Sequence, residues 1–155
     1  MDRSRFAHHR LDAYRVALEL FAGVESLGLP RGHADLKDQL RRAAAAVVRH
    51  IAEGANRYHA RDKAARFIVA RGECGECDAS LEMVSVLRLV PETRVRGLRR
   101  LADRVAAMLT GLIARQDARA ATRPLRGRGG GGGGSSCGVR TGRGPLRCLL
   151  GKSYI

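Results

Sequence analysis

The sequence contains few aromatic residues and no long apolar run. Aromatic residues make up 4% of the 155 residues and tryptophan is absent, whereas apolar residues as a group make up 45%. A core must therefore consist mainly of Leu, Val, Ile and Ala, and this composition favours helices. The longest apolar run, residues 43–48, is far shorter than the roughly 18 residues that a transmembrane helix requires. We expect no membrane span and, from the charged start MDRSRFAHHR, no secretory signal, which predicts a cytoplasmic protein.

The four cysteines do not form a pattern that predicts a disulfide or a metal site. Cys74 and Cys77 have the C-x-x-C spacing of zinc and redox sites. Both fall on the apolar stripe of a predicted helix, however, where cysteine packs as a small apolar residue. Cys137 and Cys148 are eleven residues apart in a glycine-rich segment, unlike the close pairs of zinc ribbons. We therefore expect no metal and no cofactor.

Catalytic motifs are also missing from the sequence. A di-iron bundle needs Glu-x-x-His on two helices, and no glutamate here is followed by histidine three residues later. His50 and Glu53 have this spacing in the reverse order. Gly151-Lys152-Ser153 resembles the end of a phosphate-binding loop, but Leu146 occupies the position of its first glycine. Because no nucleophile, base and orienting acid are grouped in one segment, we expect that the protein is not an enzyme.

Positive charge is concentrated at the C-terminal end. Residues 1–122 carry 22 basic and 15 acidic side chains, a net charge of +7, and residues 123–155 add seven basic and no acidic ones, for +14 in all. The second segment also contains six consecutive glycines, residues 129–134. Glycine runs lose much backbone entropy on ordering and bury no side chains. We predict a folded domain over 1–122 and a disordered Arg/Gly-rich tail over 123–155, which is either a solvated tail, the interpretation we favour, or an arm that contacts nucleic acid phosphates.

Four segments before the tail show helical periodicity. Gly28 and Pro30 end the first segment, and Gly54 is expected as the left-handed C-cap of the second segment. The third segment runs over 60–89, and Pro91 suits the first turn of the fourth segment. Apolar residues recur there at three- and four-residue steps. The four predicted stripes are Leu11, Tyr14, Leu18, Phe21 and Val24; Leu36, Leu40, Ala43, Val47 and Ile51; Phe67, Ala70, Cys74, Cys77, Leu81 and Val84; and Val95, Leu98, Leu101, Val105, Met108 and Leu112. With no strand pattern, this predicts an all-α, antiparallel up-down four-helix bundle.

Basic residues on the predicted helices are candidates for a binding surface. Arg96, Arg100 and Arg104 recur at four-residue steps and face away from the apolar stripe of their helix. Guanidinium groups pair with phosphate oxygens and displace condensed counterions, which indicates a nucleic-acid interface. The opposing interpretation is that the arginines are solvated or paired within helices, as Arg99 with Asp103. The predicted nucleic-acid-binding residues are Arg41, Arg42, Arg49, Arg57, Lys63, Arg66, Arg96, Arg100 and Arg104.

The members of this set that precede residue 67 are expected to form one positive band near the turn between the second and third helices. Aromatic side chains for base stacking are scarce outside the predicted core. Sequence-specific recognition of single strands is therefore not expected.

Two stretches of the sequence resemble a known family. QLRRAAAAVVRHIAEGANR, residues 39–57, and RFIVARGECGECDASLEM, residues 66–83, resemble the bacterial "four helix bundle protein" family, also called the 23S rRNA intervening-sequence-encoded proteins. The resemblance covers residues 11–116, and its most specific motif joins Ile51-Ala52-Glu53-Gly54 with Ala70-Arg71-Gly72 and Glu76. It implies a homopentameric ring without catalysis. The family is also related in fold to the accessory variability protein of diversity-generating retroelements, a basic pentamer that binds nucleic acid and a reverse transcriptase.

The most specific motif is expected to be structural. We expect that Gly54 caps the second helix and that Glu53 binds Arg57 or Arg71 across the turn; Gly72 and Glu76 are assigned to the same structural motif. The sequence also departs from the family, which usually has Trp in place of Tyr14, Ser in place of Ala46, Asn in place of His50 and Ser in place of Glu73. The last two replacements suggest that His50 and Glu73 pair with each other.

Two functions are consistent with these observations. The first is a non-enzymatic, basic homo-oligomer that binds RNA or DNA phosphates without strong sequence specificity. The alternative is a protein–protein interaction scaffold with no nucleic-acid role, in which the charge maintains solubility. Expected partners are a second copy of the chain, RNA or DNA, and a protein, but no membrane.

Overall fold

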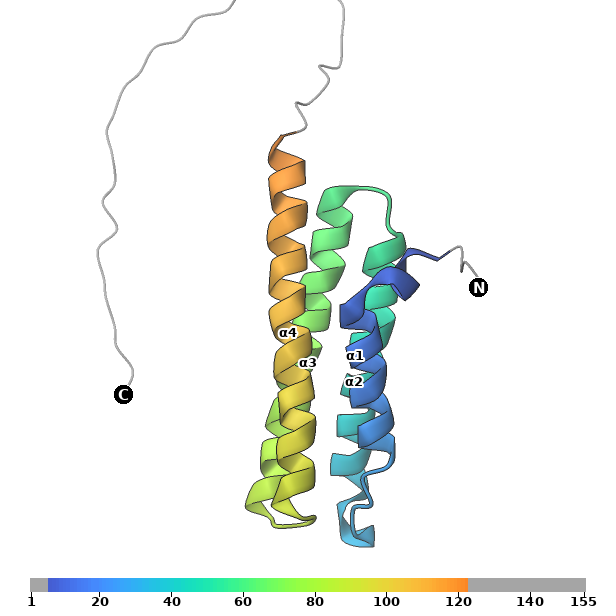
Figure 1. Cartoon of the computed structure of the whole chain (residues 1–155). Coiled ribbons are helices and arrows are strands. Elements are labelled where there is room, and N and C mark those ends of the chain that lie inside the picture. Colours follow the sequence, from blue (N-terminus) through green and yellow to red (C-terminus); the bar gives the residue numbers. More distant parts are fainter. Residues whose placement is uncertain (1–5, 123–155) are drawn as a thin grey trace, which may run out of the picture. The chain divides into compact units, whose positions relative to one another are not determined.

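The computed structural model describes residues 6–122. Those residues form the helices α1 (Asp12–Glu25), α2 (Ala34–Asn56), α3 (Ala60–Val86) and α4 (Glu92–Ala121) and two short 3-10 turns, η1 (Ala7–Arg10) and η2 (Arg31–His33). The helices run up and down in turn, so the α2–α3 turn and the end of α4 lie at the same end of the bundle (Figure 1). Since no strand occurs within residues 6–122, the predicted all-α four-helix bundle is confirmed. The predicted tail, 123–155, lies outside the described residues.

Each helix packs against two neighbours. α3 packs against α2 and α4, and α1 packs against the same two helices. α2 and α4 therefore occupy diagonally opposite corners of the bundle. The outer faces of α2 and α4 consequently point in different directions, which determines where their charged side chains can act.

The apolar stripe of α3 lies in the core as predicted. All of its members are at most 2% exposed, and they are Phe67, Ala70, Cys74, Cys77, Leu81 and Val84. The stripe predicted for α1 is only partly correct, because Leu18 is 41% exposed. The buried side of α1 instead contains Ala13, Val16, Ala17 and Leu20, where small alanines allow the neighbouring helices to approach closely. The larger side chains predicted for this stripe, such as Tyr14, are partly buried beside the core.

The α3–α4 turn is built differently from the prediction. α3 ends at Val86 rather than near residue 89, and Arg88 adopts φ 52°, in the left-handed region. The N–H of Leu89 donates to the carbonyl of Val84, and the N–H of Arg88 donates to that of Ser85. This pair of bonds is the Schellman motif, with arginine at the position where glycine is usual. Pro91 directly precedes α4 instead of lying within its first turn.

Gly54 is not a helix cap. α2 continues to Asn56, and Gly54 is buried inside the helix. A Cβ atom at Gly54 would lie 2.8 Å from Cε1 of Phe67 and 3.1 Å from Cβ of Arg66. The missing side chain therefore allows α2 and α3 to approach closely, and this contact, rather than a left-handed backbone, requires glycine.

We predict that Gly54→Val destabilises the fold by about 1–3 kcal/mol, because the new side chain overlaps the ring of the buried Phe67. Gly72→Val is the matched control, since Gly72 lies in the interior of α3 and a Cβ there meets nothing within 4 Å. Thermal or urea unfolding of both variants measures the difference. An equal change in the two variants would show that the α2–α3 contact does not require glycine.

Candidate nucleic-acid interface

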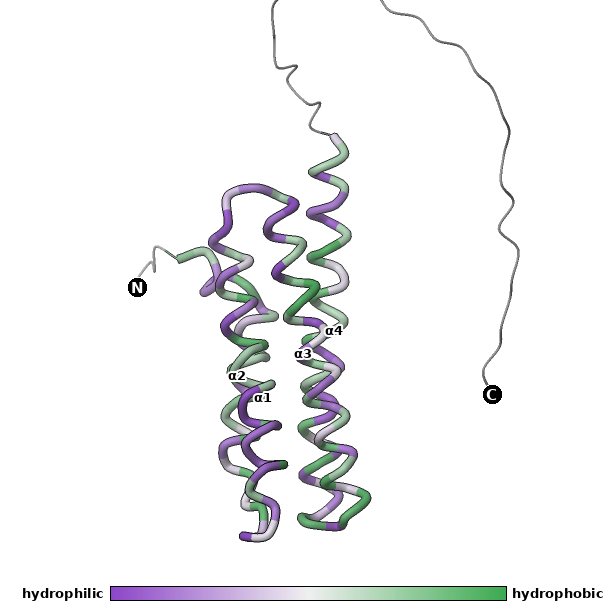
Figure 2. The backbone as a smooth tube through the Cα atoms, turned by 180° about the vertical axis from the view of Figure 1, so that it is seen from behind, coloured by the Kyte–Doolittle hydropathy of each residue, from purple (hydrophilic) through white to green (hydrophobic). Residues whose placement is uncertain are grey.

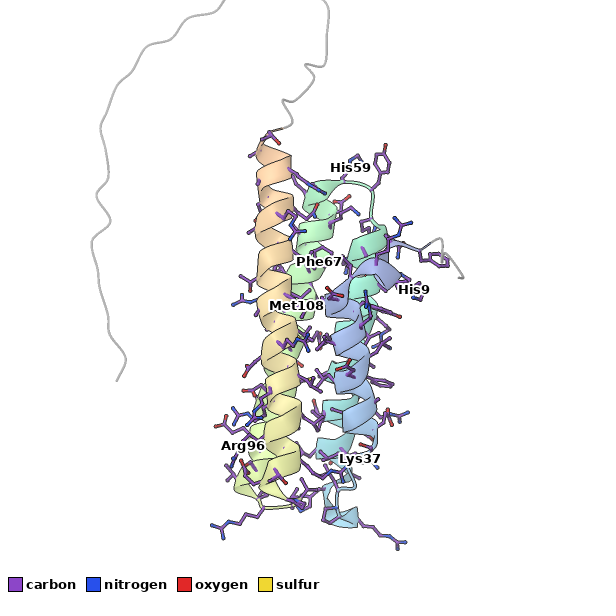
Figure 3. All side chains as sticks on the ribbon, in the orientation of Figure 1. His9, Lys37, His59, Phe67, Arg96 and Met108 are labelled. Carbon is purple, nitrogen blue, oxygen red and sulfur yellow. The ribbon has the colours of Figure 1, made fainter. Side chains whose placement is uncertain are left out.

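The predicted basic residues do not form a single band. Arg57, Lys63 and Arg66 flank the α2–α3 turn, whereas Arg42 lies in α2, 15 residues or about 22 Å before Arg57, the C-cap residue of that helix. Arg96 lies near the opposite end of the bundle from His59, which marks the α2–α3 turn (Figure 3). The prediction of one band near this turn is therefore wrong for Arg41 and Arg42, because both belong to the first half of α2. α2 and α4 are also diagonal, so their arginines occupy separate faces.

Four of the predicted residues are bound to carboxylates. Nε of Arg41 lies 2.5 Å from Oε1 of Glu25 on α1, and Nη2 of Arg96 lies 3.9 Å from Oε1 of Glu92. Arg57 and Arg66 both bind Glu53. These charges are partly neutralised within the protein and would contribute less to the binding of a phosphate group.

The other five predicted residues have no carboxylate partner among residues 6–122. Nε of Arg42 donates to the carbonyl of Asp38 at 3.3 Å, and Nζ of Lys63 donates to that of Ala55 at 2.8 Å. Both groups keep further donors, because a guanidinium has five N–H groups and an ammonium has three. The five residues are Arg42, Arg49, Lys63, Arg100 and Arg104.

Several exposed arginines that the sequence analysis did not select are also without a carboxylate partner in the described part of the chain. They are Arg10, Arg31, Arg61, Arg71, Arg88, Arg94, Arg115 and Arg119, of which Arg94 donates to Ser26. Arg115 and Arg119 repeat the four-residue step of Arg96, Arg100 and Arg104 farther along α4, so this periodicity was available in the sequence.

Glu53 binds side chains from both helices of the α2–α3 pair. Its carboxylate accepts a hydrogen bond from Nη2 of Arg57, as predicted, and Oε1 lies 3.2 Å from Nε of Arg66 on α3. Nδ1 of His50 lies 3.6 Å from Oε2 of Glu53, too far for a hydrogen bond, and has no other partner. The Arg57 hydrogen bond, and then the charges of Arg66 and Arg57, hold the pKa of Glu53 below its usual value.

Of the two partners predicted for Glu53, Arg57 binds it and Arg71 does not, and Arg66 is a further partner that was not predicted. The predicted pairing of His50 with Glu73 is wrong, because His50 approaches Glu53 instead. Arg71, Gly72 and Glu76 are exposed on α3 and do not contribute a hydrogen bond or ion pair to this cluster. Of the α3 half of the resemblance motif, only Ala70 is therefore buried in the core.

Arg99 links α4 to α3 rather than pairing within its own helix. Its Nε and Nη2 donate to the two carboxylate oxygens of Asp78 at 2.6 and 3.0 Å. The predicted i, i+4 partner, Asp103, makes no ion pair with Arg99 within 4.0 Å. This bidentate bond removes Arg99 from the candidates for phosphate binding.

The buried thiols are not activated. Cys74 and Cys77 are 2% and 0% exposed, and burial, with the nearby Glu73 carboxylate, raises the pKa of each thiol to about 12. No group of three His, Cys, Asp or Glu residues that suits a metal ion is found in the described range. Cys137 and Cys148, and the Gly151-Lys152-Ser153 segment, lie outside that range.

An apolar pocket of about 710 Å³ lies at the end opposite the α2–α3 turn. It is lined by exposed side chains at the end of α3, of which Met83, Val86 and Leu87 are 54%, 75% and 52% exposed. η2 and the start of α2 form its other wall. Hydrophobic residues also gather at the α3–α4 turn (Figure 2). Exposed apolar patches of this kind mark contact surfaces.

These observations define a basic helical bundle whose described part carries exposed arginines on its helices. Residues 9–111 match the sequence model of a family described as 23S rRNA-intervening sequence protein, and the chain belongs to this family. Comparison with individually curated proteins gives no significant match. Within the described residues, none of the helices is both long enough and apolar enough to cross a membrane.

We predict that Glu53→Gln removes a contribution to stability that depends on pH. Because the pKa of Glu53 is lowered in the folded state, its contribution is fully present above the ordinary value of 4.5 and is lost as the pH falls through the lower folded value. The difference in melting temperature between the native protein and Glu53→Gln should therefore be largest near neutral pH and should shrink in acid. Glu19→Gln, which changes an exposed carboxylate that forms no ion pair with a residue in 6–122, is the control. A difference independent of pH would contradict the assignment.

We also predict that Cys74 and Cys77 resist alkylation by iodoacetamide in the native protein. With a pKa of about 12, very little thiolate is present at pH 8, and the thiols are buried. The variant Cys137→Ser/Cys148→Ser leaves these two as the only thiols, and mass spectrometry counts the adducts. Both should react after unfolding in guanidinium chloride. Rapid labelling in native buffer would contradict burial of the pair.

Proposed function

We propose that this protein is a non-enzymatic RNA- or DNA-binding protein that contacts phosphates without strong sequence specificity. The observation that carries the proposal is the set of exposed arginines without a carboxylate partner, above all Arg42 and Arg49 on α2 and Arg100 and Arg104 on α4. Guanidinium groups bind phosphate oxygens in bidentate geometry, and each neutralised phosphate releases condensed counterions. The family name, which refers to a 23S rRNA intervening sequence, is consistent with an RNA ligand.

The proposal assigns phosphate binding to two separate surfaces. Arg42 and Arg49 lie two turns apart on the exposed side of α2, and Arg100 and Arg104 lie one turn apart on the exposed side of α4. Because α2 and α4 are diagonal, one copy of the protein would contact two strands or two parts of one strand. Linked weak contacts of this kind raise the overall affinity.

Self-association is part of the proposal. α3 buries one apolar stripe in the core and also exposes apolar side chains on its other side, namely Ile68, Val69, Met83 and Val86, which are 55%, 40%, 54% and 75% exposed. Exposed apolar side chains on a helix favour association with another copy. A homopentamer, as the family resemblance implies, would repeat the two arginine surfaces around the assembly.

The apolar pocket at the end of α3 supports a second candidate, a scaffold that binds another protein. Met83, Val86 and Leu87 would form the apolar centre of such an interface. Such an interface should depend much less on salt than phosphate binding does.

Binding of structured RNA and duplex DNA over a series of salt concentrations tests the proposal. We expect the full chain and residues 1–122 both to bind, with a log–log slope of about −0.9 for each neutralised phosphate on a duplex. Arg42→Gln/Arg49→Gln and Arg100→Gln/Arg104→Gln should each reduce the slope by up to about 1.8.

Arg41→Gln/Arg96→Gln is the matched control, because it removes the same charge from arginines that are bound to Glu25 and Glu92. This variant should change the slope less than the two others. No binding by residues 1–122 at low salt would reject the proposal and favour the scaffold. Equal effects of all three variants would indicate a response to net charge rather than to these surfaces.

A further inference from the structure

A second, smaller pocket lies beside the α2–α3 turn. Its volume is about 210 Å³, and it is formed by residues of the N-terminal segment, the end of α2, the start of α3 and the end of α4. Leu11, Phe67 and Leu112 give it an apolar wall. Figure 1 shows why these segments meet, since the end of α4 lies beside the α2–α3 turn and the N-terminal turn lies at the same end of the bundle. This pocket belongs to neither arginine surface of the proposed function.

Gln116 is the feature of this pocket that the fold does not explain. It is 7% exposed and is the one buried polar residue in the described part of the chain. Its side-chain amide makes no hydrogen bond with another described residue. The amide is not sealed in the core, however, because His50 Nδ1 is the only fully enclosed side-chain polar atom without a partner within residues 6–122. An amide has two N–H donors and one carbonyl acceptor, and buried polar groups are normally satisfied, so the pocket is where a partner for Gln116 would bind.

Three cations surround the same pocket, and no carboxylate lines it. Arg115 and Arg119 lie one turn apart on α4, and neither has an ion-pair partner among the described residues. Nζ of Lys63 donates to the carbonyl of Ala55 at 2.8 Å and keeps two further donors. A ligand in this pocket would therefore be an anion.

The chemistry of the pocket restricts the ligand further. The apolar wall suits a flat ring, the Gln116 amide suits the donor and acceptor groups at the edge of such a ring, and the cations suit a phosphate. The volume is below the roughly 300–1,000 Å³ of pockets that hold drug-sized ligands, so one ring system fits rather than several stacked bases. A nucleotide combines these three properties.

We propose that this pocket binds one unstacked nucleotide, with the base against Phe67 and Leu112 and hydrogen-bonded to Gln116, and the phosphate on Arg115 and Arg119. The nucleotide is either free or an unpaired residue of a nucleic acid chain. In the second case the inference rests on the proposed function and adds a contact to a base, because a paired and stacked base cannot enter the pocket. The protein would then prefer nucleic acids with unpaired nucleotides over fully paired duplexes.

The test compares the full chain with pocket variants in binding to two RNA hairpins, one with a single unpaired bulged nucleotide and one fully paired in its stem. Both hairpins are closed by the same non-nucleotide linker, so that the bulge is the only unpaired nucleotide. Gln116→Leu keeps the size and burial of the side chain but removes the amide. Its loss of affinity for the bulged hairpin should be at least tenfold larger than its loss of affinity for the fully paired hairpin. Arg119→Gln, at an exposed position that does not threaten folding, should act in the same direction.

Arg100→Gln/Arg104→Gln is the matched comparison on the same helix. It should weaken binding of both hairpins alike, since these arginines lie outside the pocket. If Gln116→Leu and Arg119→Gln weaken binding of both hairpins equally, or weaken binding of neither hairpin, the pocket does not bind an unpaired nucleotide of the RNA.

Titration of the full chain with each nucleoside 5′-monophosphate, followed by NMR or calorimetry, tests the free nucleotide. Inorganic phosphate is the probe for the cations alone. Loss of nucleotide binding in Gln116→Leu would support the pocket even if no hairpin binds, that is, even if the proposed function fails. Competition by inorganic phosphate as strong as that by the nucleotides would overturn the base contact. Absence of binding in both the hairpin and the nucleotide experiments would overturn the inference.

Discussion

The close contact between α2 and α3 at Gly54 is the constraint on which most other features depend. The absence of a side chain there places α2 against the ring of Phe67, and the neighbouring Glu53 can then bind Arg66 of α3 while it also binds Arg57 at the C-cap of α2. Phe67 in turn forms part of the wall of the small pocket. A single glycine thus fixes the distance between two helices, the position of an ion-pair cluster and the shape of a cavity. The contact is steric, so it has little tolerance for added volume.

α3 carries several of the features that follow from this contact. One of its sides is fully buried between α2 and α4, and its buried stripe includes Cys74 and Cys77. Small residues at these two positions allow the neighbouring helices to pack closely, and burial keeps the thiols protonated. The C-x-x-C spacing is therefore a consequence of helical periodicity in a packed core. The exposed side of α3 keeps Ile68, Val69 and Met83 among charged residues such as Arg71 and Glu76, so apolar side chains occur on both sides of this helix.

The sequence alone predicted features that depend on one helix, but it did not predict features that depend on the relative positions of two helices. Helical periodicity predicted the elements, the buried stripe of α3 and the bond between Glu53 and Arg57, which are four residues apart. It did not predict the bonds of Arg41 to Glu25 or of Arg99 to Asp78, because these join different helices and require their relative positions. Gly54 was predicted to be structurally important, but as a helix cap. In the sequence, a glycine that caps a helix cannot be distinguished from one that allows a neighbouring helix to approach closely. The small pocket could not be predicted, since Leu11, Lys63 and Gln116 meet only in the folded chain.

The division of the arginines into two groups follows from this distinction. Arginines that bind a carboxylate of a neighbouring helix, such as Arg41 and Arg99, stabilise the arrangement of the bundle and have fewer donors available for a ligand. Arginines on the outer faces of α2 and α4, such as Arg49 and Arg104, have no such partner among residues 6–122 and remain exposed to solvent. Net charge alone does not separate these groups, because each arginine contributes +1 in either case. Since α2 and α4, which carry Arg49 and Arg104, are diagonal, the proposed phosphate ligand would contact these arginines on separate faces. A ligand that reaches both faces would have to bend around the bundle or span more than one copy of it.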